Sequence, residues 1–314
     1  MATRMPGRSI RWIPVFTLAN GHEVQLAVHE IVGAEEGPVL GLVAGIHGDE
    51  PLGVEMVRRA LDAIDPATLT GSVLALPVAN PYALQAARRN TPLDMMNLNR
   101  VFPGDPGGML TEQLAHVIRR EFLPRIQYLI DYHSGGTFPT VDYIYLDERD
   151  PDLSRAYGCE YLYRSQGFAG TLTGEARQLG IPSIVSELGG GGHRDEYYIA
   201  KGFGGALSVM RHLGMIPGEA VRAERQWVFD ELVTIRPSQG GTLISHVEVE
   251  RLGGRVAGGT VLGEVRNAAT FELLETLRAP YDSSILILVR EGVSTVDPGD
   301  YAYMIGNAAG AVEM

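Results

Sequence analysis

The sequence predicts an α/β protein in which a mixed sheet is flanked by helices and followed by a smaller all-β module. Two features carry this prediction. Over the first 213 residues, apolar runs typical of strands buried on both faces alternate with stretches suited to helices. From Trp227 onward the apolar runs become short and alternating, with Gly, Pro and Asp between them. We place the boundary at about residue 220, which gives an α/β part over 1–220 and a β module over 221–314.

A hairpin and a buried strand open the chain. Residues 13–18 and 24–32 flank Asn20-Gly21, a dipeptide that favours a tight turn between antiparallel strands. We expect this pair to lie at an edge of the sheet. The next apolar run, 38–44, lacks alternation between apolar and polar residues, so it is expected to form a central parallel strand.

Strands and helices then follow one another in alternation. The remaining buried strands are expected at 71–79, 128–133, 141–146 and 182–188. Helices are expected at 51–61, 111–122, 170–179 and 196–213. In the β module, short strands are expected at 233–235, 242–245, 261–265, 285–289 and 301–305. This order favours a parallel or mixed sheet with helices on both faces.

The composition is that of a soluble globular protein and narrows the class of partner. A formal net charge of −12 over 314 residues argues against nucleic acid, whose phosphates would be repelled, but does not exclude a small anionic substrate. Cys159 is the only cysteine, which excludes an intramolecular disulfide and a cysteine-rich metal site. No apolar run reaches membrane-spanning length and residues 1–11 lack a signal-peptide core, so we expect a cytoplasmic protein without membrane association.

A histidine and a carboxylate directly follow the predicted central strand. The turn reads Gly45-Ile46-His47-Gly48-Asp49-Glu50, and a helix starts near Pro51 with Asp49 as its candidate N-cap. In open α/β sheets, ligands bind at the carboxyl ends of strands. His47 and Glu50 can therefore aim at one point, and an imidazole with a carboxylate suits zinc. The alternative is a capped helix beside a solvated histidine.

Two further strands end in groups of the same kind. His133 closes one of them, and Glu187 comes just before four glycines at the end of another. Because the carboxyl ends of parallel strands meet at one edge of a sheet, we expect His133 to join His47 and Glu50 as a third zinc ligand, leaving a fourth position for water. Glu187 would then handle protons, and Asp131 could orient a ligand. The alternatives are a core histidine at 133 and a loop-capping carboxylate at 187.

The polar stretch from Arg88 to Gly108 supplies cations. It shows little periodicity, and a long loop inside a compact domain is often functional. It contains Arg89, Asn99 and Arg100, and a planar guanidinium can bind a carboxylate through two hydrogen bonds. We therefore consider this loop a candidate site for an anionic substrate.

Together these motifs resemble those of the succinylglutamate desuccinylase/aspartoacylase family, within the zinc carboxypeptidase-like superfamily. The matching segments, in the family's order, are 45–50, 97–102, 131–134 and 186–189. The resemblance implies a zinc-carboxypeptidase-like sheet followed by a β module with the character of a biotinyl/lipoyl-like barrel. The sequence has no Met-Lys-Met-like attachment site for biotin or lipoate.

The resemblance also implies a cofactor and a base. It implies one Zn²⁺ per chain, bound by His47, Glu50 and His133, with Glu187 activating the attacking water. Glu187 would then return the proton to the leaving amine.

Three residues of the polar loop match the family's substrate-binding positions. Asn99 and Arg100 resemble the pair that binds the substrate carboxylate, and Arg89 resembles the arginine that polarises the scissile carbonyl. The interval between Arg89 and Arg100 is longer than in aspartoacylases, so Arg88 is a competitor for that role.

A further departure concerns the support of the ligands. The family often has Asp where this chain has Asn97, so the support of a histidine is expected from Asp94 or Asp131 instead.

We therefore expect zinc-dependent hydrolysis of the amide bond of a small N-acyl amino acid, a carbon–nitrogen bond other than a peptide bond. The alternatives are a metallocarboxypeptidase that acts on a short peptide and a non-catalytic zinc-binding protein of the same fold. The acyl group and the amine stay open, as does the formation of a homo-oligomer.

Overall fold

The computed structural model describes residues 5–165 and 167–313. The segment 1–11, for which no signal peptide is expected, therefore lies partly outside the described residues.

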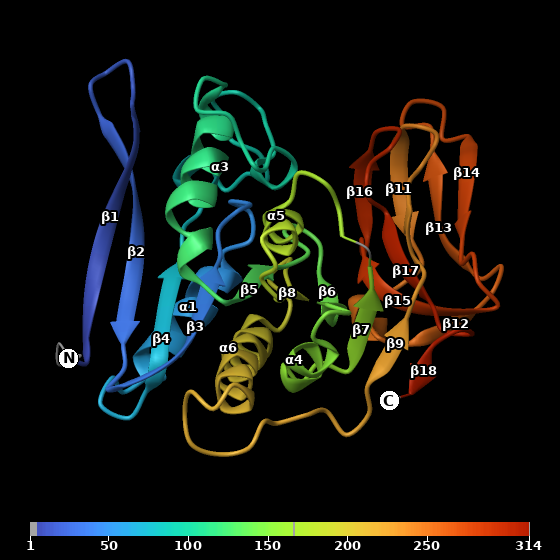
Figure 1. Ribbon diagram of the computed structural model, residues 1–314. Coiled ribbons are helices and arrows are strands. Elements are labelled where there is room, and N and C mark those ends of the chain that lie inside the picture. Colours follow the sequence, from blue (N-terminus) through green and yellow to red (C-terminus); the bar gives the residue numbers. More distant parts are fainter. Residues whose placement is uncertain (1–4, 166, 314) are drawn as a thin grey trace.

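A long hairpin opens the fold (Figure 1). Its strands, β1 (Gly7–Thr17) and β2 (Glu23–Val32), pair antiparallel around the Asn20-Gly21 turn. The backbone of Gly21 has φ +82°, a conformation that glycine adopts without strain. The hairpin forms an edge of the main sheet, as the turn signal predicts.

Four parallel strands form the centre of the main sheet. In spatial order they are β4 (Thr70–Leu76), β3 (Glu35–Val43), β5 (Tyr128–His133) and β8 (Ser183–Gly189). β2 pairs antiparallel with β4 and joins the hairpin to this centre. The expected buried strands are therefore confirmed, with ends shifted by a few residues.

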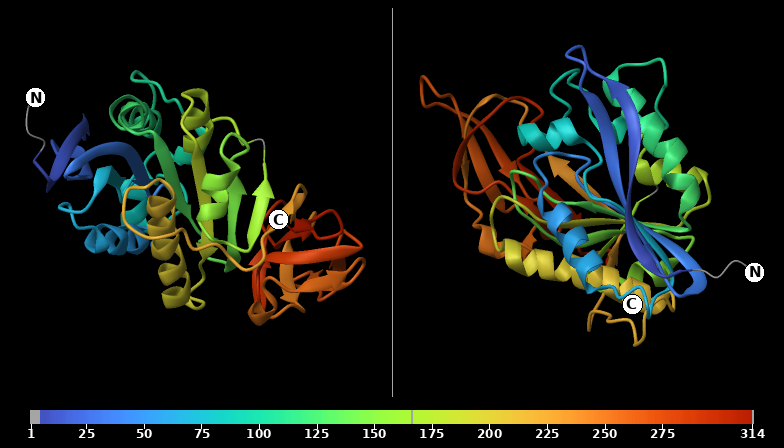
Figure 2. Two further views of the ribbon diagram at one scale, coloured as in Figure 1. Left: turned by 60° about the horizontal axis from the view of Figure 1, so that its bottom comes forward. Right: turned by 90° about the vertical axis from the view of Figure 1, so that its left-hand side faces the viewer.

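Helices cover both faces of the sheet. One face carries α1 (Leu52–Ala63), α4 (Pro151–Ala156) and α6 (Asp195–His212), and the other carries α3 (Leu110–Glu121) and α5 (Leu172–Gln178). Successive residues of β5 show the division, because Ile130 packs in the core under α1 and α6 while Leu129 packs in the core under α3. Figure 2 shows α1 and α6 side by side on one side of the sheet.

Several short elements were not expected from the sequence. They are the helices α2 (Pro81–Ala86) and α4 and the 3₁₀ turns η1 (Leu98–Arg100), η2 (Leu123–Arg125) and η3 (Val249–Arg251). Each is only one or two turns long, too short for its apolar periodicity to be recognised. None of the helices in the described residues has the length and apolar content needed to span a bilayer.

The main sheet continues into the carboxyl-terminal part of the chain through β6 (Thr140–Leu146). β6 runs antiparallel to β8, and its other edge pairs with both β7 (Tyr161–Arg164) and β15 (Ser283–Val289). Beyond β15 the sheet adds β17 (Tyr303–Asn307) and β10 (Leu232–Ile235), while β9 (Trp227–Phe229) extends it beyond β7. The sheet therefore branches at β6.

A second, antiparallel sheet lies in the carboxyl-terminal part. Its strands, in spatial order, are β14 (Leu273–Arg278), β13 (Val261–Arg266), β11 (Gly241–Ser245) and β16 (Val293–Val296). Two short strands, β12 (Arg255–Ala257) and β18 (Val312–Glu313), pair with β15 and β9. The strand-rich character predicted after Trp227 is confirmed, but these strands are shared between two sheets. The barrel character and the division at residue 220 stay predictions.

Candidate active site

The turn after β3 holds two of the predicted site residues in a fixed place. Gly48 makes this possible, because a Cβ added to it would lie 1.8 Å from the backbone carbonyl group of Ala83. The N–H of Gly48 donates to the carbonyl oxygen of Arg88 at 2.9 Å. The turn is thus packed against the segment that contains and follows α2, and this contact fixes His47 and Glu50 at the carboxyl end of the sheet.

The prediction that Asp49 caps α1 is wrong. Pro51 occupies the N-cap position, and no side chain accepts a hydrogen bond from the first turn of the helix. The carboxylate of Asp49 lies instead beside Gly136, where an added Cβ would be 2.9 Å from its Oδ2. The turn therefore directs Asp49 to the loop after β5 and away from the helix axis.

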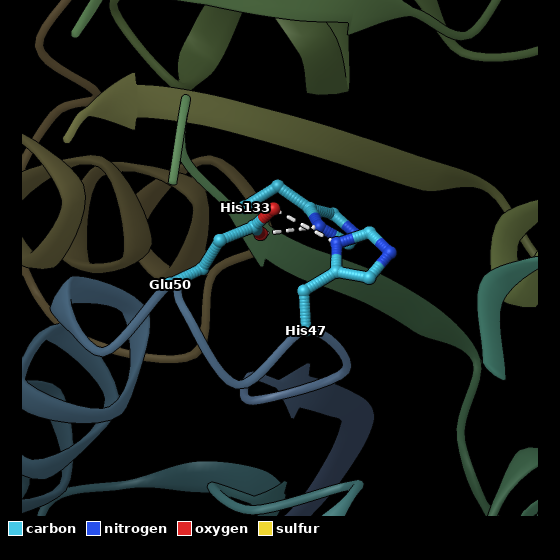
Figure 3. Close-up of side chains that lie close together, drawn as sticks. All are labelled: His47, Glu50 and His133. Atoms are coloured by element: carbon cyan, nitrogen blue, oxygen red, sulfur yellow. Dashed lines mark hydrogen bonds and ion pairs between the residues drawn. The ribbon is translucent and has the colours of Figure 1, made fainter. Parts of the chain in front are cut away.

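His47, Glu50 and His133 converge at the ends of β3 and β5 (Figure 3). Nδ1 of His47 lies 2.8 Å from Oε1 of Glu50, and Nδ1 of His133 lies 2.8 Å from Oε2 of the same carboxylate. One ligand atom from each residue falls within 4.8 Å of the others, and all three side chains are buried. The structure thus brings together the three residues that the sequence predicts as metal ligands.

Each histidine directs its second ring nitrogen toward an acceptor. Nε2 of His47 is 3.1 Å from Oδ1 of Asn97, and Nε2 of His133 is 3.2 Å from Oδ2 of Asp131. These contacts hold a proton on each Nε2, so each Nδ1 is the atom that would give a lone pair to a cation. A cation between these atoms satisfies all of them, and two imidazole nitrogens with one carboxylate form a donor set that suits zinc.

Burial and charge shift the pKa of all three side chains of this cluster. At His133, burial opposes the charged form, but the carboxylates of Asp131 and Glu50 outweigh it and raise the pKa well above its ordinary value. Burial lowers the pKa of His47 despite the Glu50 carboxylate. Burial also opposes ionisation of Glu50, yet the two imidazoles hold the pKa of this carboxyl well below its usual range. The buried Glu50 and Asp131 carboxylates therefore favour a positive charge at His133, whereas His47 favours its neutral form.

The supports of the histidines differ in part from the prediction. Asp131 supports His133, which is one of the two expected sources. The hypothesis that Asp94 supports a histidine is wrong, because its carboxylate accepts from the N–H and the hydroxyl of Thr111 at 2.8 and 2.7 Å. Those contacts hold the start of α3. Asn97 itself supports His47, since an amide oxygen accepts a hydrogen bond as a carboxylate would.

Glu187 lies on β8 in register with His133 on β5. Because paired residues on neighbouring strands share one face of a sheet, both side chains are directed to the face of α3 and α5. Burial raises the pKa of Glu187 to about 7; the positive charge of His133 works against this shift, and the negative charge of Glu50 adds to it. A carboxyl with this pKa can both accept and return a proton at neutral pH.

The polar loop brings its two neighbouring arginines, Arg88 and Arg89, to a cavity that also contains His47, Glu50 and His133. Nη1 of Arg89 lies 3.2 Å from Oε1 of Glu50 and 3.4 Å from Nδ1 of His47. Arg88 lines the cavity as well, so both candidates for this role face the site.

Asn99 and Arg100 lie on η1 at the wall of the cavity. The Oδ1 of Asn99 accepts from the N–H of Leu172 at 2.9 Å, and its Nδ2 is 3.3 Å from Nε2 of His133. Arg100 is exposed, and its Nη1 donates to the carbonyl oxygen of Asn99 at 2.6 Å. Asn99 is thus held by the protein, whereas Arg100 keeps most of its donors for other partners.

One cavity of about 870 Å³ is lined by His47, Glu50, Arg88, Arg89, Asn99, Arg100, His133 and Glu187. Its remaining walls contain residues that sequence reasoning missed. One group consists of aromatic side chains on β6 and β7: Tyr143, Tyr145 and Tyr163. Another comes from the carboxyl-terminal part: Leu232, Thr234, Arg236, Leu288, Arg290, Asp300, Tyr301 and Met304. The alternation along 141–146 could have indicated that the two tyrosines of β6 share a face, but their neighbours depend on the sheet order.

The chain belongs to the succinylglutamate desuccinylase/aspartoacylase family, because residues 36–213 match the model of the family's catalytic domain. This is a family of N-acyl amino acid deacylases. The chain is similar to the N-alpha-acetyl-L-2,4-diaminobutyric acid deacetylase of Halomonas elongata, with 32% identity over 203 residues. The match covers 60% of this chain and 58% of that protein, less than two thirds of the relative's length.

Solved structures share the whole fold. A succinylglutamate desuccinylase/aspartoacylase from Rhodobacter sphaeroides has a TM-score of 0.85 at 23% identity, covering 98% of this chain and 97% of its own. The ectoine utilization protein EutE from Ruegeria pomeroyi, in a product-bound structure, has a TM-score of 0.84 at 23% identity, with 98% of both chains covered. At this level of identity the likeness shows the fold, including the carboxyl-terminal strands.

Proposed function

We propose that this protein is a metal-dependent deacylase that hydrolyses the amide bond of a small N-acyl amino acid. The observation that carries the proposal is the convergence of two Nδ1 atoms on the Glu50 carboxylate, with the Nε2 atoms held by Asn97 and Asp131. His47, Glu50 and His133 would hold one Zn²⁺ per chain. When bound there, zinc lowers the pKa of a water and polarises a carbonyl oxygen.

Glu187 serves as the general base and acid in this proposal. With its pKa near 7, it takes a proton from the water that attacks the acyl carbon. It then gives that proton to the nitrogen of the departing amine. Its place beside His133 supports this role, because the strand register holds the carboxylate next to the proposed metal site.

The arginines supply positive charge for the substrate and the transition state. Arg89 stabilises the oxyanion that develops on the scissile carbonyl, a role supported by its proximity to Glu50 and His47. Arg100 binds the carboxylate of the substrate, with Asn99 beside it. Arg88 lines the same wall and is the alternative to Arg89.

The family and the curated relative support an N-acyl amino acid as substrate. The relative from Halomonas elongata is named as a deacetylase of an acetylated diamino acid, and acetylated or succinylated amino acids are therefore the first compounds to examine. A metallocarboxypeptidase or a non-catalytic zinc-binding protein would use the same ligand set, so the experiment must distinguish these alternatives.

The experiment combines metal analysis with a substrate panel. Purified protein with about one zinc per chain is offered N-acetyl and N-succinyl derivatives of aspartate, glutamate and 2,4-diaminobutyrate, and a set of dipeptides. Release of free amino acid from the N-acyl compounds alone supports the proposal. Faster release from dipeptides favours the carboxypeptidase, and zinc binding without any hydrolysis favours the binding protein.

A further inference from the structure

The floor of the cavity continues past Glu187 as a row of aromatic side chains. In the register of the sheet, His133 on β5 pairs with Glu187 on β8, and Glu187 pairs with Tyr143 on β6. Two residues further along β6, Tyr145 pairs with Tyr163 on β7. Cross-strand partners share a face, and residues two apart on a strand do as well, so these side chains lie on one face of the sheet.

Ring contacts join these tyrosines into one surface. The ring centroids of Tyr143 and Tyr145 are 5.9 Å apart, and those of Tyr145 and Tyr163 are 5.4 Å apart. Tyr163 in turn stacks on Phe229 at 5.5 Å, which fixes the outer end of the row. Burial raises the pKa of both Tyr143 and Tyr145, so their phenol groups are uncharged at neutral pH.

The carboxyl-terminal strands supply apolar side chains to the same part of the cavity. Leu232 on β10, Leu288 on β15 and Met304 on β17 line it together with the tyrosines. These strands join the sheet at the point where it branches from β6. The part of the cavity beyond Glu187 therefore carries an aromatic and apolar surface, which we call the aromatic half, defined by Tyr143, Tyr145, Tyr163, Leu232, Leu288 and Met304. The same carboxyl-terminal segments also bring polar residues to the cavity: Thr234, Arg236, Arg290, Asp300 and Tyr301.

The other half of the cavity is cationic. Arg88, Arg89 and Arg100 come from the polar loop and line the walls around the His47 turn. Glu187 stands between the two halves.

We infer that the aromatic half is a subsite for an apolar acyl group larger than acetyl, best filled by an aromatic ring. This inference rests on the proposed function, in which the substrate carboxylate binds to Arg100 and the scissile carbonyl lies near Glu187. In an N-acyl amino acid, the acyl chain leaves the carbonyl carbon on the side opposite to the amino acid. With the carboxylate in the cationic half, the acyl chain extends over the tyrosines.

Strand spacing gives the size of the group. Neighbouring strands lie about 4.8 Å apart, so the tyrosines of β6 stand about 5 Å beyond Glu187 and Tyr163 about 10 Å beyond it. An acetyl methyl group lies one bond from the carbonyl carbon and covers only a small part of this distance. A phenylacetyl group spans the first step, and a 4-phenylbutanoyl group extends toward the second.

Two arginines that line the cavity, Arg290 and Arg236, already have hydrogen-bond and ring partners in the protein. Arg290 donates to the hydroxyl of Ser294 and to the carbonyl oxygens of Tyr301 and Thr295, and it lies over the ring of Phe138. Arg236, which is exposed, donates to a backbone carbonyl oxygen and lies 4.2 Å from the ring centroid of Tyr301. A succinyl group, whose carboxylate could displace the contacts of Arg236, is therefore the competing occupant and belongs in the test.

The first test compares acyl groups on one and the same amino acid. For each of aspartate, glutamate and 2,4-diaminobutyrate, kcat/KM is measured for the N-acetyl, N-succinyl, N-phenylacetyl and N-(4-phenylbutanoyl) derivatives. We expect the aromatic acyl groups to exceed acetyl by about tenfold or more, because an apolar pocket gains from each buried methylene. Equal or lower values for the aromatic groups, or the highest value for succinyl, overturn the inference while leaving the deacylase proposal intact.

The second test places the preference on Tyr163. In Tyr163→Ala, the ratio of kcat/KM for 4-phenylbutanoyl over acetyl should fall about tenfold, and Tyr163→Phe should keep it because the ring remains. Tyr197→Ala is the matched control, since Tyr197 lies on α6 and is not among the residues lining the cavity. An unchanged ratio in Tyr163→Ala contradicts the inference.

A binding measurement separates this inference from the proposed function. Glu187→Gln protein is titrated in a calorimeter with the N-acetyl and N-phenylacetyl derivatives of the same three amino acids. We expect Kd for the phenylacetyl compounds to be at least about tenfold lower. If the parent protein hydrolyses none of the compounds, the proposed function fails. The difference in Kd then tests by itself whether the aromatic half binds an aromatic acyl group. Equal Kd values, or no binding of either series, overturn the inference.

Discussion

His133 and Glu187 are direct neighbours across the parallel strands β5 and β8. The first belongs to the proposed metal centre and the second is the proposed base. Their relative position is fixed by the hydrogen bonds of the sheet, not by a loop, so the distance between them depends on the register of two buried strands. This arrangement keeps Glu187 on the strand beside the proposed metal centre, which suits a base for a water that attacks there.

We expect His47→Ala and His133→Ala to lose the metal. Each change removes one of the three protein ligands, and the two that remain hold a divalent cation far less tightly. Elemental analysis should find zinc well below the content of the parent protein, which we expect to be about one per chain. His22→Ala is the control, because His22 is an exposed residue of the β1–β2 hairpin turn. Full zinc content in both site variants would exclude this cluster as the metal site.

Glu187→Gln should keep zinc and substrate binding but lose most turnover. The amide has nearly the same shape as the carboxyl group, yet it cannot accept a proton from water or return it to the leaving nitrogen. General acid–base catalysis contributes a rate factor of about a hundred to ten thousand. At equal zinc content, kcat should therefore decrease by a factor in this range. A kcat within about threefold of the parent, far short of the general-base range, would assign Glu187 a structural role. Asp49 and Asp131 would then be the candidates for the base.

Arg100→Ala should mainly raise KM. The exposed guanidinium has one bond to the carbonyl oxygen of Asn99 and further N–H groups available for a carboxylate. Losing a hydrogen bond between charged groups costs about 1.5–3 kcal/mol, which corresponds to about tenfold to a hundredfold in KM. Arg225→Ala, whose side chain is 71% exposed, serves as the control. Unchanged KM and kcat on the best substrate of the panel would remove Arg100 from the site.

Asp147 should make stability depend on acid pH. Its buried carboxylate accepts from the N–H of Ser183 at 2.9 Å and binds the guanidinium of Arg149, which also donates to the carbonyl oxygen of Ile181. Burial opposes ionisation, but these hydrogen bonds outweigh it and hold the pKa of Asp147 below its ordinary value. The ionised form is therefore the stabilising one.

Because the folded pKa is the lower one, this contribution is complete above the unfolded pKa and is lost as pH falls through the folded pKa. Asp147→Asn should lower the free energy of unfolding at pH 7 by about 1.5–3 kcal/mol, the range for a hydrogen bond to a charged group. Urea denaturation of both proteins from pH 7 downward should show the gap narrowing below about pH 4. A gap that does not change with pH would show that the charge of Asp147 contributes nothing.

Local patterns in the sequence were sufficient to place the strand ends that carry the site. Long apolar runs marked the buried strands because a parallel strand is covered on both faces. The functional groups followed those runs directly, so His47, Glu50, His133 and Glu187 could be assigned to one edge before their distances were known. Short elements such as α2 and β7 were missed because a few residues carry too little periodicity to be recognised.

The tertiary structure decided everything that depends on which strands are neighbours. In the folded chain, Asn97 supports His47, Asp49 does not cap α1, and Tyr143 lies beside Glu187. The tertiary structure also brought the carboxyl-terminal strands to the wall of the cavity. The sequence itself determined the burial of each segment and the chemistry at its ends, because both are local properties. Contacts between residues far apart in the chain follow from the order of the strands in the sheet, which no local pattern of residues encodes.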